Sequence, residues 1–292
     1  MKAGLVVGGI SVALSTPPND PLERLLASRY QRFLRAIDDP VLWLTLRSRR
    51  IEAIERSQAR EVIVDGESVI IRDERFHGEF TIGGRGVMEL APSIAAIDGA
   101  LETVLATIGP SHSLLLLRAA AVVSHGRGHL LLGKGSARAL ALARRAHRPI
   151  LGAVSVALQL EESRCVMHGT PFSTEAVGCD TRSPLLATWM ISGDDAENVA
   201  EPVGPAQAAG WILEHALLPA PSSQAATAFD IATQVATFGT AAAFLGLGTD
   251  RSWDRLDELG AAIGYRRALT IEQPLLRSGL LGGLEPMGEG RI

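Results

Sequence analysis

The sequence has little of several residue types, and each shortage excludes a class of protein. Of its 292 residues only two are cysteine, two are lysine and 4% are aromatic. Two cysteines are too few for a disulfide scaffold, and a formal net charge of −4 argues against a surface that neutralises nucleic-acid phosphates. The apolar runs fall short of the roughly 20 residues that a membrane-spanning helix needs. With 47% hydrophobic and 21% charged residues, the composition indicates a globular protein with a packed core.

The cysteines and the first residues indicate a cytoplasmic protein. Cys165 and Cys179 form no C-x-x-C pair and have no paired histidines nearby, so we expect two reduced thiols, with a redox or metal role as the alternative. Residues 1–10 contain one lysine before a short apolar run and no small-residue cleavage site, and the alternation that follows is typical of a strand. We therefore expect a cytoplasmic location without a membrane span.

The first 110 residues predict a small α+β unit. A strand is expected over 8–14, and Asp20 followed by Pro21 marks the start of a helix whose apolar spacing continues to Ile37. Asp65-Gly66 between two β-branched runs predicts a hairpin. Two further strands and a second helix with an apolar face follow, and Gly109-Pro110 ends that helix. We place a domain boundary at residue 110.

The most informative pattern lies in the middle third, where Gly133-Lys134-Gly135-Ser136 joins a short apolar strand to a helix over 137–146. A strand, a glycine-rich turn with lysine and hydroxyl, and a helix form the architecture of a phosphate-binding loop. The full motif, G-x-x-x-x-G-K-[ST], is longer, and here the lysine comes one position early. We predict at most a weak anion site, made of Gly133, Lys134, Gly135, Ser136 and Arg138, with a plain strand–helix turn as the alternative.

Three segments resemble the catalytic core of HPr kinase/phosphorylase-like proteins: residues 115–123, 128–133 and 139–145, in that order and spacing. The chain is most similar to the HPr-kinase-related proteins of peptide natural-product and PqqD-associated gene clusters, over about residues 4–259, with further matches at 166–173 and 250–253. The resemblance implies an α/β fold. Its parts are an α+β N-terminal unit (1–110), a degenerate kinase-like P-loop core (111–269) and a tail (270–292).

The chain departs from the kinase pattern where the chemistry would occur. Ala153 and Val154, on a strand expected over 150–158, occupy the positions of the family's two aspartates, and Arg118 stands where many relatives have histidine. Phosphoryl transfer needs a phosphate cradle, a metal held by oxygen ligands and a group that orients the nucleophile. We therefore expect no catalytic residues, no metal site and no cofactor, with ATP and magnesium as the alternative. That alternative requires that carboxylates at other positions of the sequence hold the magnesium: Glu161, Glu162, Asp180, Asp194, Asp195 and Glu197.

Two further residues are candidates for facing a ligand. His168 and Thr170 lie in the segment 166–173, and the alternative for His168 is a turn histidine that bonds the backbone. Helices are expected after Pro205, after Ser222 or Ser223, and after Asp250. The tryptophans at 189, 211 and 253 are interpreted as core residues, with a partner-binding stripe as the alternative. The tail is either a flexible end or a strap that docks on another subunit.

Three functions stay open at this stage. The first, which we favour, is a catalytically inactive HPr-kinase-like scaffold that binds a peptide or a protein partner, in a peptide natural-product modification system. The second is an ATP-dependent serine/threonine kinase with a divergent phosphate loop. The third is a structural subunit of a larger assembly. Nucleic acid is not an expected partner, and a homo- or hetero-oligomer is compatible with each of the three.

Overall fold

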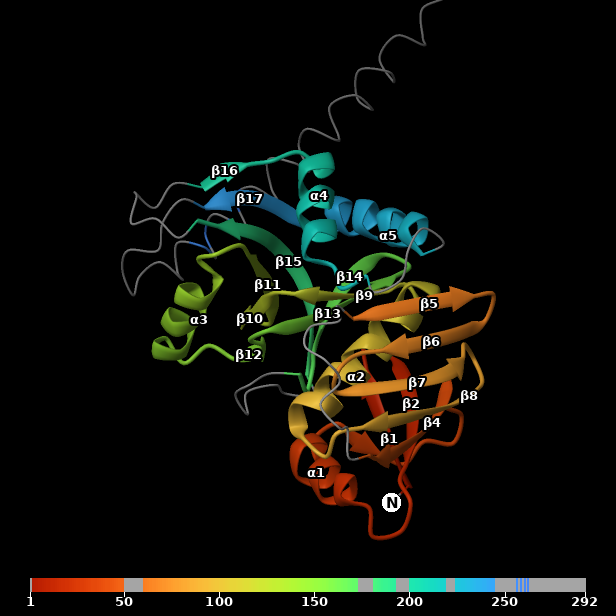
Figure 1. Cartoon of the computed structure of the whole chain (residues 1–292). Coiled ribbons are helices and arrows are strands. Elements are labelled where there is room, and N and C mark those ends of the chain that lie inside the picture. Colours follow the sequence, from red (N-terminus) through yellow and green to blue (C-terminus); the bar gives the residue numbers. More distant parts are fainter. Residues whose placement is uncertain are drawn as a thin grey trace, which may run out of the picture.

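The protein has a mixed α/β fold with two large sheets and several helices (Figure 1). The structure is a computed structural model that describes residues 2–49, 60–172, 181–192, 200–218 and 224–244, together with positions 256, 258, 260 and 262. The tail over 270–292, Trp253 and Cys179 lie outside the described residues, and the helix expected after Asp250 is described only at positions 256, 258, 260 and 262, which are helical. In the described part of the chain, no helix combines the length and the apolar character needed to cross a membrane.

The first sheet takes its eight strands from the first 90 residues. They are β1 (Lys2–Val7), β2 (Ile10–Ser15), β3 (Leu34–Arg35), β4 (Leu42–Ser48), β5 (Glu61–Asp65), β6 (Ser68–Arg72), β7 (Phe76–Thr81) and β8 (Arg85–Leu90). Their order across the sheet is β3-β1-β2-β4-β8-β7-β6-β5, and β4 runs parallel to both of its neighbours. The hairpin predicted at Asp65-Gly66 is formed by β5 and β6. Alternation of buried and exposed residues along the strands gives this sheet one apolar and one polar face.

Two helices cover the apolar face of this sheet: α1 (Pro21–Tyr30) and α2 (Ile94–Ile108). The Asp20 carboxylate caps α1 by accepting from the amide of Leu22 at 2.9 Å. The Tyr30 hydroxyl donates to Asp98 of α2, and Arg29 pairs with the same carboxylate at 2.9 Å. Burial, and then the charge of Asp98, raise the pKa of Tyr30 well above its ordinary value. This cluster fixes the two helices to each other.

The second sheet follows α2 and a 3-10 turn over Gly109–His112. Its nine strands are β9 (Leu114–Arg118), β10 (Ala120–Ser124), β11 (Arg127–Leu132), β12 (Ile150–Gly152), β13 (Ser155–Glu161), β14 (Arg164–Gly169), β15 (Arg182–Ile191), β16 (Ala200–Pro202) and β17 (Thr240–Phe244). The long strand β15 joins its two halves. The first half of β15 pairs with β14, and the second half lies parallel to both β11 and β17.

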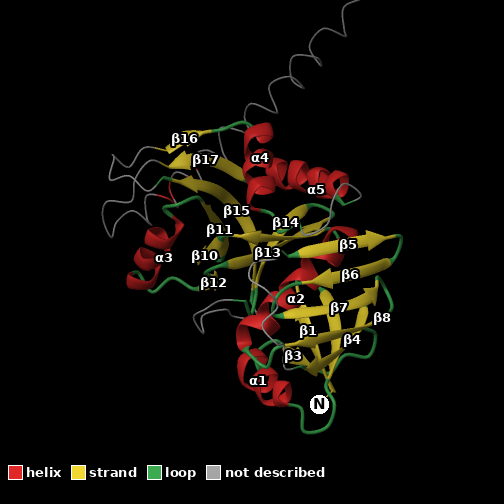
Figure 2. Ribbon diagram, viewed as in Figure 1, coloured by secondary structure: helices red, strands yellow, loops and turns green. Residues whose placement is uncertain are grey.

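Three helices pack on the second sheet: α3 (Ser136–Arg145), α4 (Pro205–His215) and α5 (Ala225–Phe238). Helices α4 and α5 share one apolar core with β9, β13 and β14, and α3 covers another with β10, β11 and β15 (Figure 2). The core beneath α1 and α2 also contains Leu114, Leu116 and Ala157 of the second sheet, and Phe172, which follows β14. One apolar core thus contains residues from both sides of position 110. The domain boundary at that position stays a prediction.

Three predicted elements have different limits in the structure. The strand predicted over 8–14 begins at Ile10, because Gly8 and Gly9 adopt positive φ angles of 56° and 77° and form the turn of the β1–β2 hairpin. The first helix ends at Tyr30 and not at Ile37, because the chain then pairs with β1 as β3. The single strand predicted over 150–158 is two strands, since β12 joins β10 and β13 joins β9.

Candidate functional site

The shortened glycine-rich turn lies between β11 and α3, as its sequence predicts. Strand β11 ends at Leu132 and α3 begins at Ser136. Gly133 has a φ angle of 83°, a backbone conformation in which a residue with a side chain is strained. This explains the glycine at that position. The turn sits at the carboxyl end of β11, beside the carboxyl end of the parallel strand β15. Lys134 and Arg138 are exposed, and Ser136 is half-buried.

Three amides of the turn are used inside the protein. The Gly135 N–H donates to the carbonyl of Ile191 at 3.1 Å, and the Ser136 N–H donates to the carbonyl of Gly133 at 3.2 Å. The Gly133 N–H donates to Nε2 of His215 at 3.3 Å. A phosphate-binding loop works because its amides point at the anion. These three amides are directed at protein atoms.

The turn is also packed closely against the end of β15. A Cβ atom added to Gly135 would lie 2.2 Å from the carbonyl oxygen of Ser192 and 2.5 Å from Cγ2 of Ile191. Real Cβ atoms essentially never approach other atoms this closely. The backbone of the turn therefore lies in close contact with the backbone at the end of β15.

His215 is a residue of this region that the sequence did not reveal. Its Nδ1 lies 2.9 Å from the carbonyl of Trp211, which can only accept, so Nδ1 carries a proton and donates. Nε2 is then free of a proton and accepts the bond from Gly133. The residue ends α4, 82 positions along the chain from Gly133. Only the folded packing of α4 beside β11 brings the two together.

The structure does not bring His168 and Thr170 to the turn. His168 pairs across the sheet with Arg182, which is at the opposite end of β15 from Ile191. Burial, together with the charge of Arg182, lowers the pKa of His168. Thr170 is fully buried, and its hydroxyl donates to the carbonyl of Ser155 at 2.7 Å. This hydrogen bond connects the residue that follows β14 to the start of β13 in the protein interior.

The positions that the resemblance assigns to kinase chemistry do lie together. Arg118, at the end of β9, is the register partner of Ser155, and the amide of Ala119 donates to the carbonyl of Val154 at 3.2 Å. The side chain of Val154 is exposed, and Ala153 beside it is half-buried. This corner thus presents alanine and valine where magnesium ligands would be needed.

Of the carboxylates suggested as replacements, the two that the structure describes, Glu161 and Glu162, lie at the other end of β13 from this corner. Glu161 forms an ion pair with Arg164 at 2.6 Å, and Glu162 is exposed on the turn that follows. Asp180, Asp194, Asp195 and Glu197 lie outside the described residues. Among the residues that the structure describes, no three His, Cys, Asp or Glu side chains are placed to hold a metal ion together. Cys165 is buried, and burial raises the pKa of its thiol to about 12.

One carboxylate does approach the corner, from the first part of the chain. Glu102 lies on α2, and burial raises its pKa above the ordinary value of 4.5, although the charge of Arg118 opposes this shift. A raised pKa means that the folded state holds the proton more tightly than the unfolded state. The stabilisation from the protonated acid is complete below pH 4.5 and is lost as the pH rises through the folded-state pKa.

We therefore expect a pH-dependent difference in stability between the wild-type protein and a Glu102→Gln variant. The amide keeps the shape of the protonated acid and does not titrate. The free energy of unfolding of the wild type, minus that of the variant, should be highest at pH 4 and fall between pH 4.5 and pH 7. Urea unfolding at four pH values in this range measures it, and a constant difference would contradict the assigned shift.

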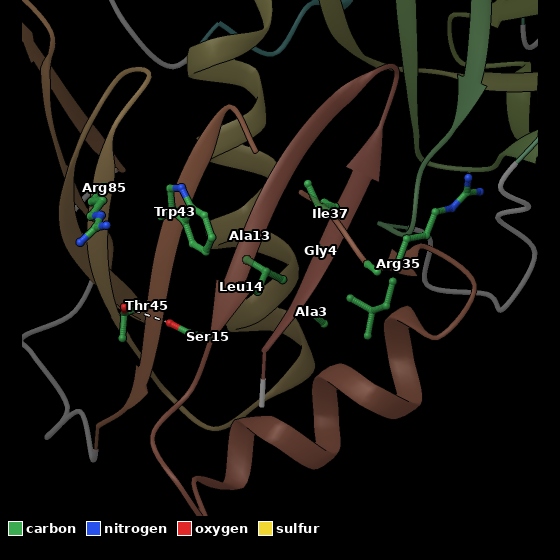
Figure 3. Close-up of a pocket in the computed structure, with 13 residues that line it drawn as sticks. Ala3, Gly4, Ala13, Leu14, Ser15, Arg35, Ile37, Trp43, Thr45 and Arg85 are labelled. Atoms are coloured by element: carbon green, nitrogen blue, oxygen red, sulfur yellow. Dashed lines mark hydrogen bonds between the residues drawn. The ribbon is translucent and has the colours of Figure 1, made fainter. Parts of the chain in front are cut away.

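A hollow of about 800 Å³ lies on the polar face of the first sheet, away from the turn (Figure 3). It is lined by β1, β2, β4 and β8 and by the segment that follows α1. Trp43 is 47% exposed at its floor, and two arginines, Arg35 and Arg85, are the only ionisable residues among the lining side chains. Such a volume falls within the range of small-ligand and peptide pockets. This hollow was not predicted from the sequence.

Comparisons with known proteins leave the family open. No protein-family model matches the chain, and no curated protein matches it. A solved structure with detectable similarity is the Hpr(Ser) kinase/phosphatase from Coxiella burnetii, with 12% sequence identity and a TM-score of 0.26. The match covers 57% of this chain and 99% of that one. A likeness at this level carries no conclusion about activity.

Proposed function

We propose that the chain is a catalytically inactive, HPr-kinase-like protein that binds a peptide or a protein partner. The proposal rests chiefly on one observation, the hydrogen bond from the Gly135 amide to the carbonyl of Ile191 within a turn packed on β15. A donor used in this way is not available to a β- or γ-phosphate. The residues at the neighbouring corner, Ala153 and Val154, support the proposal because neither side chain has an oxygen to hold magnesium.

The fold leaves a surface for contact that does not depend on this turn. The hollow around Trp43 is open, and an exposed indole provides a large rigid contact area for a partner. We infer that the kinase-like core serves as a scaffold, and that its client is a peptide or protein of a peptide natural-product modification system. The client is contacted and not chemically changed.

Binding of nucleotide tests this function directly. A ligand that binds only the native state must raise the apparent melting temperature. We expect no rise with ATP and magnesium beyond that given by magnesium alone, and no transfer of labelled phosphate from ATP to added peptides. A rise of several degrees with magnesium-ATP, abolished by Lys134→Ala, would overturn the proposal and favour a kinase.

A further inference from the structure

The first sheet ends in a strand with an unpaired outer edge. Strand β5 is last in the strand order and has β6 as its neighbour, and Figure 1 shows it as the outermost of the strands β5 to β8. The other sheet ends in the described part of the chain offer less backbone. Strand β3 has two residues, β12 and β16 have three each, and β9 is bridged by Ala216 and Leu217. With five residues in continuous register, β5 is the longest edge that a further strand could join.

Two valines carry the outward-facing backbone groups of this edge. The β5–β6 hairpin closes on a two-residue turn after Asp65. The residues next to such a turn exchange hydrogen bonds, and every second pair along the ladder does the same. Counting back from Asp65, Ile63 and Glu61 bond to β6, so Val62 and Val64 direct their N–H and C=O groups away from the sheet. No residue within the described ranges bonds to these outward groups.

The side chains at this edge are apolar in the middle and acidic near the turn. Ile63 is 37% exposed on the polar face, and its register partner Ile70 is half-buried beside it. Asp65 and Glu67 are exposed, and neither forms an ion pair with another residue that the structure describes. This pattern is complementary to an extended segment that is apolar in its middle and basic where it meets the turn.

A second copy of this chain is a poor partner for the edge. Two β5 strands that overlap completely in antiparallel pairing would be centred on Ile63, and Glu61 would lie opposite Asp65 at both ends. Like charges directly opposite each other destabilise a sheet. Charged residues on an edge strand protect it against self-association, and the charges of β5 all have the same sign. This protection does not act against a basic partner.

We propose that β5 binds an extended, basic peptide segment as an additional antiparallel strand. The segment has β-branched residues in its middle and an arginine or lysine opposite Asp65. This inference rests on the function proposed above, to which it adds a second contact surface, separate from the hollow around Trp43.

Each part of the edge has a task toward such a segment. Val62 and Val64 exchange backbone hydrogen bonds with the peptide, and this main-chain pairing supplies affinity. The side chain opposite Ile63 packs on Ile63 and on the neighbouring Ile70. The basic side chain meets the carboxylate of Asp65, and this contact fixes the register and direction of the peptide.

Fluorescence polarisation with a labelled peptide tests this inference on the full chain. The probe is a capped pentapeptide of arginine, valine, isoleucine, valine and arginine, with the dye attached through a glycine-serine linker. Its charge twin has glutamate in place of both arginines. We expect the twin to bind about fivefold to tenfold more weakly, because its end meets Asp65 and Glu67 with like charge. Added salt should reduce this difference.

Two N-methylated peptides separate strand addition from a general attraction of charge. Methyl groups on the nitrogens of both valines remove the donors that face Val62 and Val64, and they should weaken binding about tenfold or more. A methyl group on the nitrogen of the central isoleucine replaces an N–H that points away from β5. That peptide should keep its affinity within about threefold.

Variants of the protein locate the site. Val64→Pro removes an outward N–H that the sheet does not use, a position at which an edge strand tolerates proline, and it should weaken binding about tenfold. Asp65→Asn should weaken it about threefold. Glu201→Gln, at an exposed carboxylate of β16, is the control and should leave the affinity unchanged. Thermal melting shows whether each variant is folded. If Val64→Pro is not, the two N-methylated peptides decide the question.

Several outcomes would overturn the inference: no measurable binding of the basic peptide, equal binding of its glutamate twin, equal effects of the two methylation patterns, or an equal loss in Glu201→Gln. A dimer in sedimentation that Asp65→Asn strengthens and Val64→Pro disrupts would assign the edge to a second copy instead. Failure here without nucleotide binding leaves the inactive scaffold standing, with its partner bound elsewhere. Phosphate transfer from ATP would defeat the proposed function, whatever the peptide result at β5.

Discussion

Replacing Gly135 by alanine is expected to lower the free energy of unfolding by about 2–3 kcal/mol, a large loss for one methyl group. The added Cβ would lie 2.2 Å from the carbonyl oxygen of Ser192, and backbone atoms cannot move aside as a flexible side chain can. Either the turn or the end of β15 must shift, and the hydrogen bond from the Gly135 amide to Ile191 is weakened. Urea unfolding followed by circular dichroism measures the loss.

The matched control is Gly210→Ala in α4. A Cβ atom there meets no other atom within 4 Å, and the position is exposed within a helix. Alanine is the better helix former, so this variant should gain about 0.5–1 kcal/mol. The two glycine-to-alanine changes thus have opposite expected signs, although their effects on the unfolded chain are the same.

The Gly135 result also bears on function. If Gly135→Ala left the stability unchanged, the turn would not be packed on β15, and its amides would be free to meet an anion. The main support for an inactive turn would then be lost. A large loss of stability together with no response to magnesium-ATP would instead agree with the proposed inactive turn, because an amide that is bonded to the end of β15 is not available to a phosphate.

The local signals in the sequence predicted the local structure well. Asp20 with Pro21 starts a helix, Asp65-Gly66 turns a hairpin, and the strand–turn–helix around Gly133 is present. Each of these depends on neighbouring residues and on backbone preferences. Gly8-Gly9 had a comparable signal for a turn, but the strand predicted over 8–14 included both glycines, and the first strand of the hairpin, β1, was missed.

The contacts that decide the candidate sites are distant in the sequence. The partners of the turn, Ile191 and His215, come from β15 and α4, and no spacing rule connects them to Gly133. On the first sheet, the parallel pairing of β2, β4 and β8 likewise places Ala13, Trp43 and Arg85 in one row across the strands. Parallel pairing needs long connections, and a single sequence does not say which strands become neighbours.

One residue of that row had a local signal. Residues 42–48 alternate, with Leu42, Leu44 and Leu46 buried and with Trp43 and Thr45 on the opposite side. A tryptophan on the polar face of an amphipathic strand is unusual enough to mark a contact surface. The sequence interpretation considered Trp189, Trp211 and Trp253 for that role. Of these, Trp189 is fully buried, Trp211 is half-buried and Trp253 lies outside the described residues.

Trp189→Ala is expected to lower the free energy of unfolding by about 3–5 kcal/mol. The indole is fully buried beneath α3, its Nε1 donates to Nδ1 of His129 at 3.0 Å, and the two rings stack with their centres 6.3 Å apart. Alanine leaves a cavity and removes the donor to His129. Trp189→Phe keeps most of the apolar volume and loses the donor, so its loss should be intermediate, about 1–2 kcal/mol.

Trp43→Ala is the contrasting variant, because the two tryptophans have opposite roles in this interpretation. Trp43 is 47% exposed, and its removal should cost less than about 1 kcal/mol. Denaturant unfolding of both variants under one set of conditions gives the comparison. Equal losses would mean that Trp43 is a packing residue and that the hollow is not an open site. A stable Trp43→Ala protein would instead assign Trp189 to the core and leave Trp43 as an exposed residue of the open hollow.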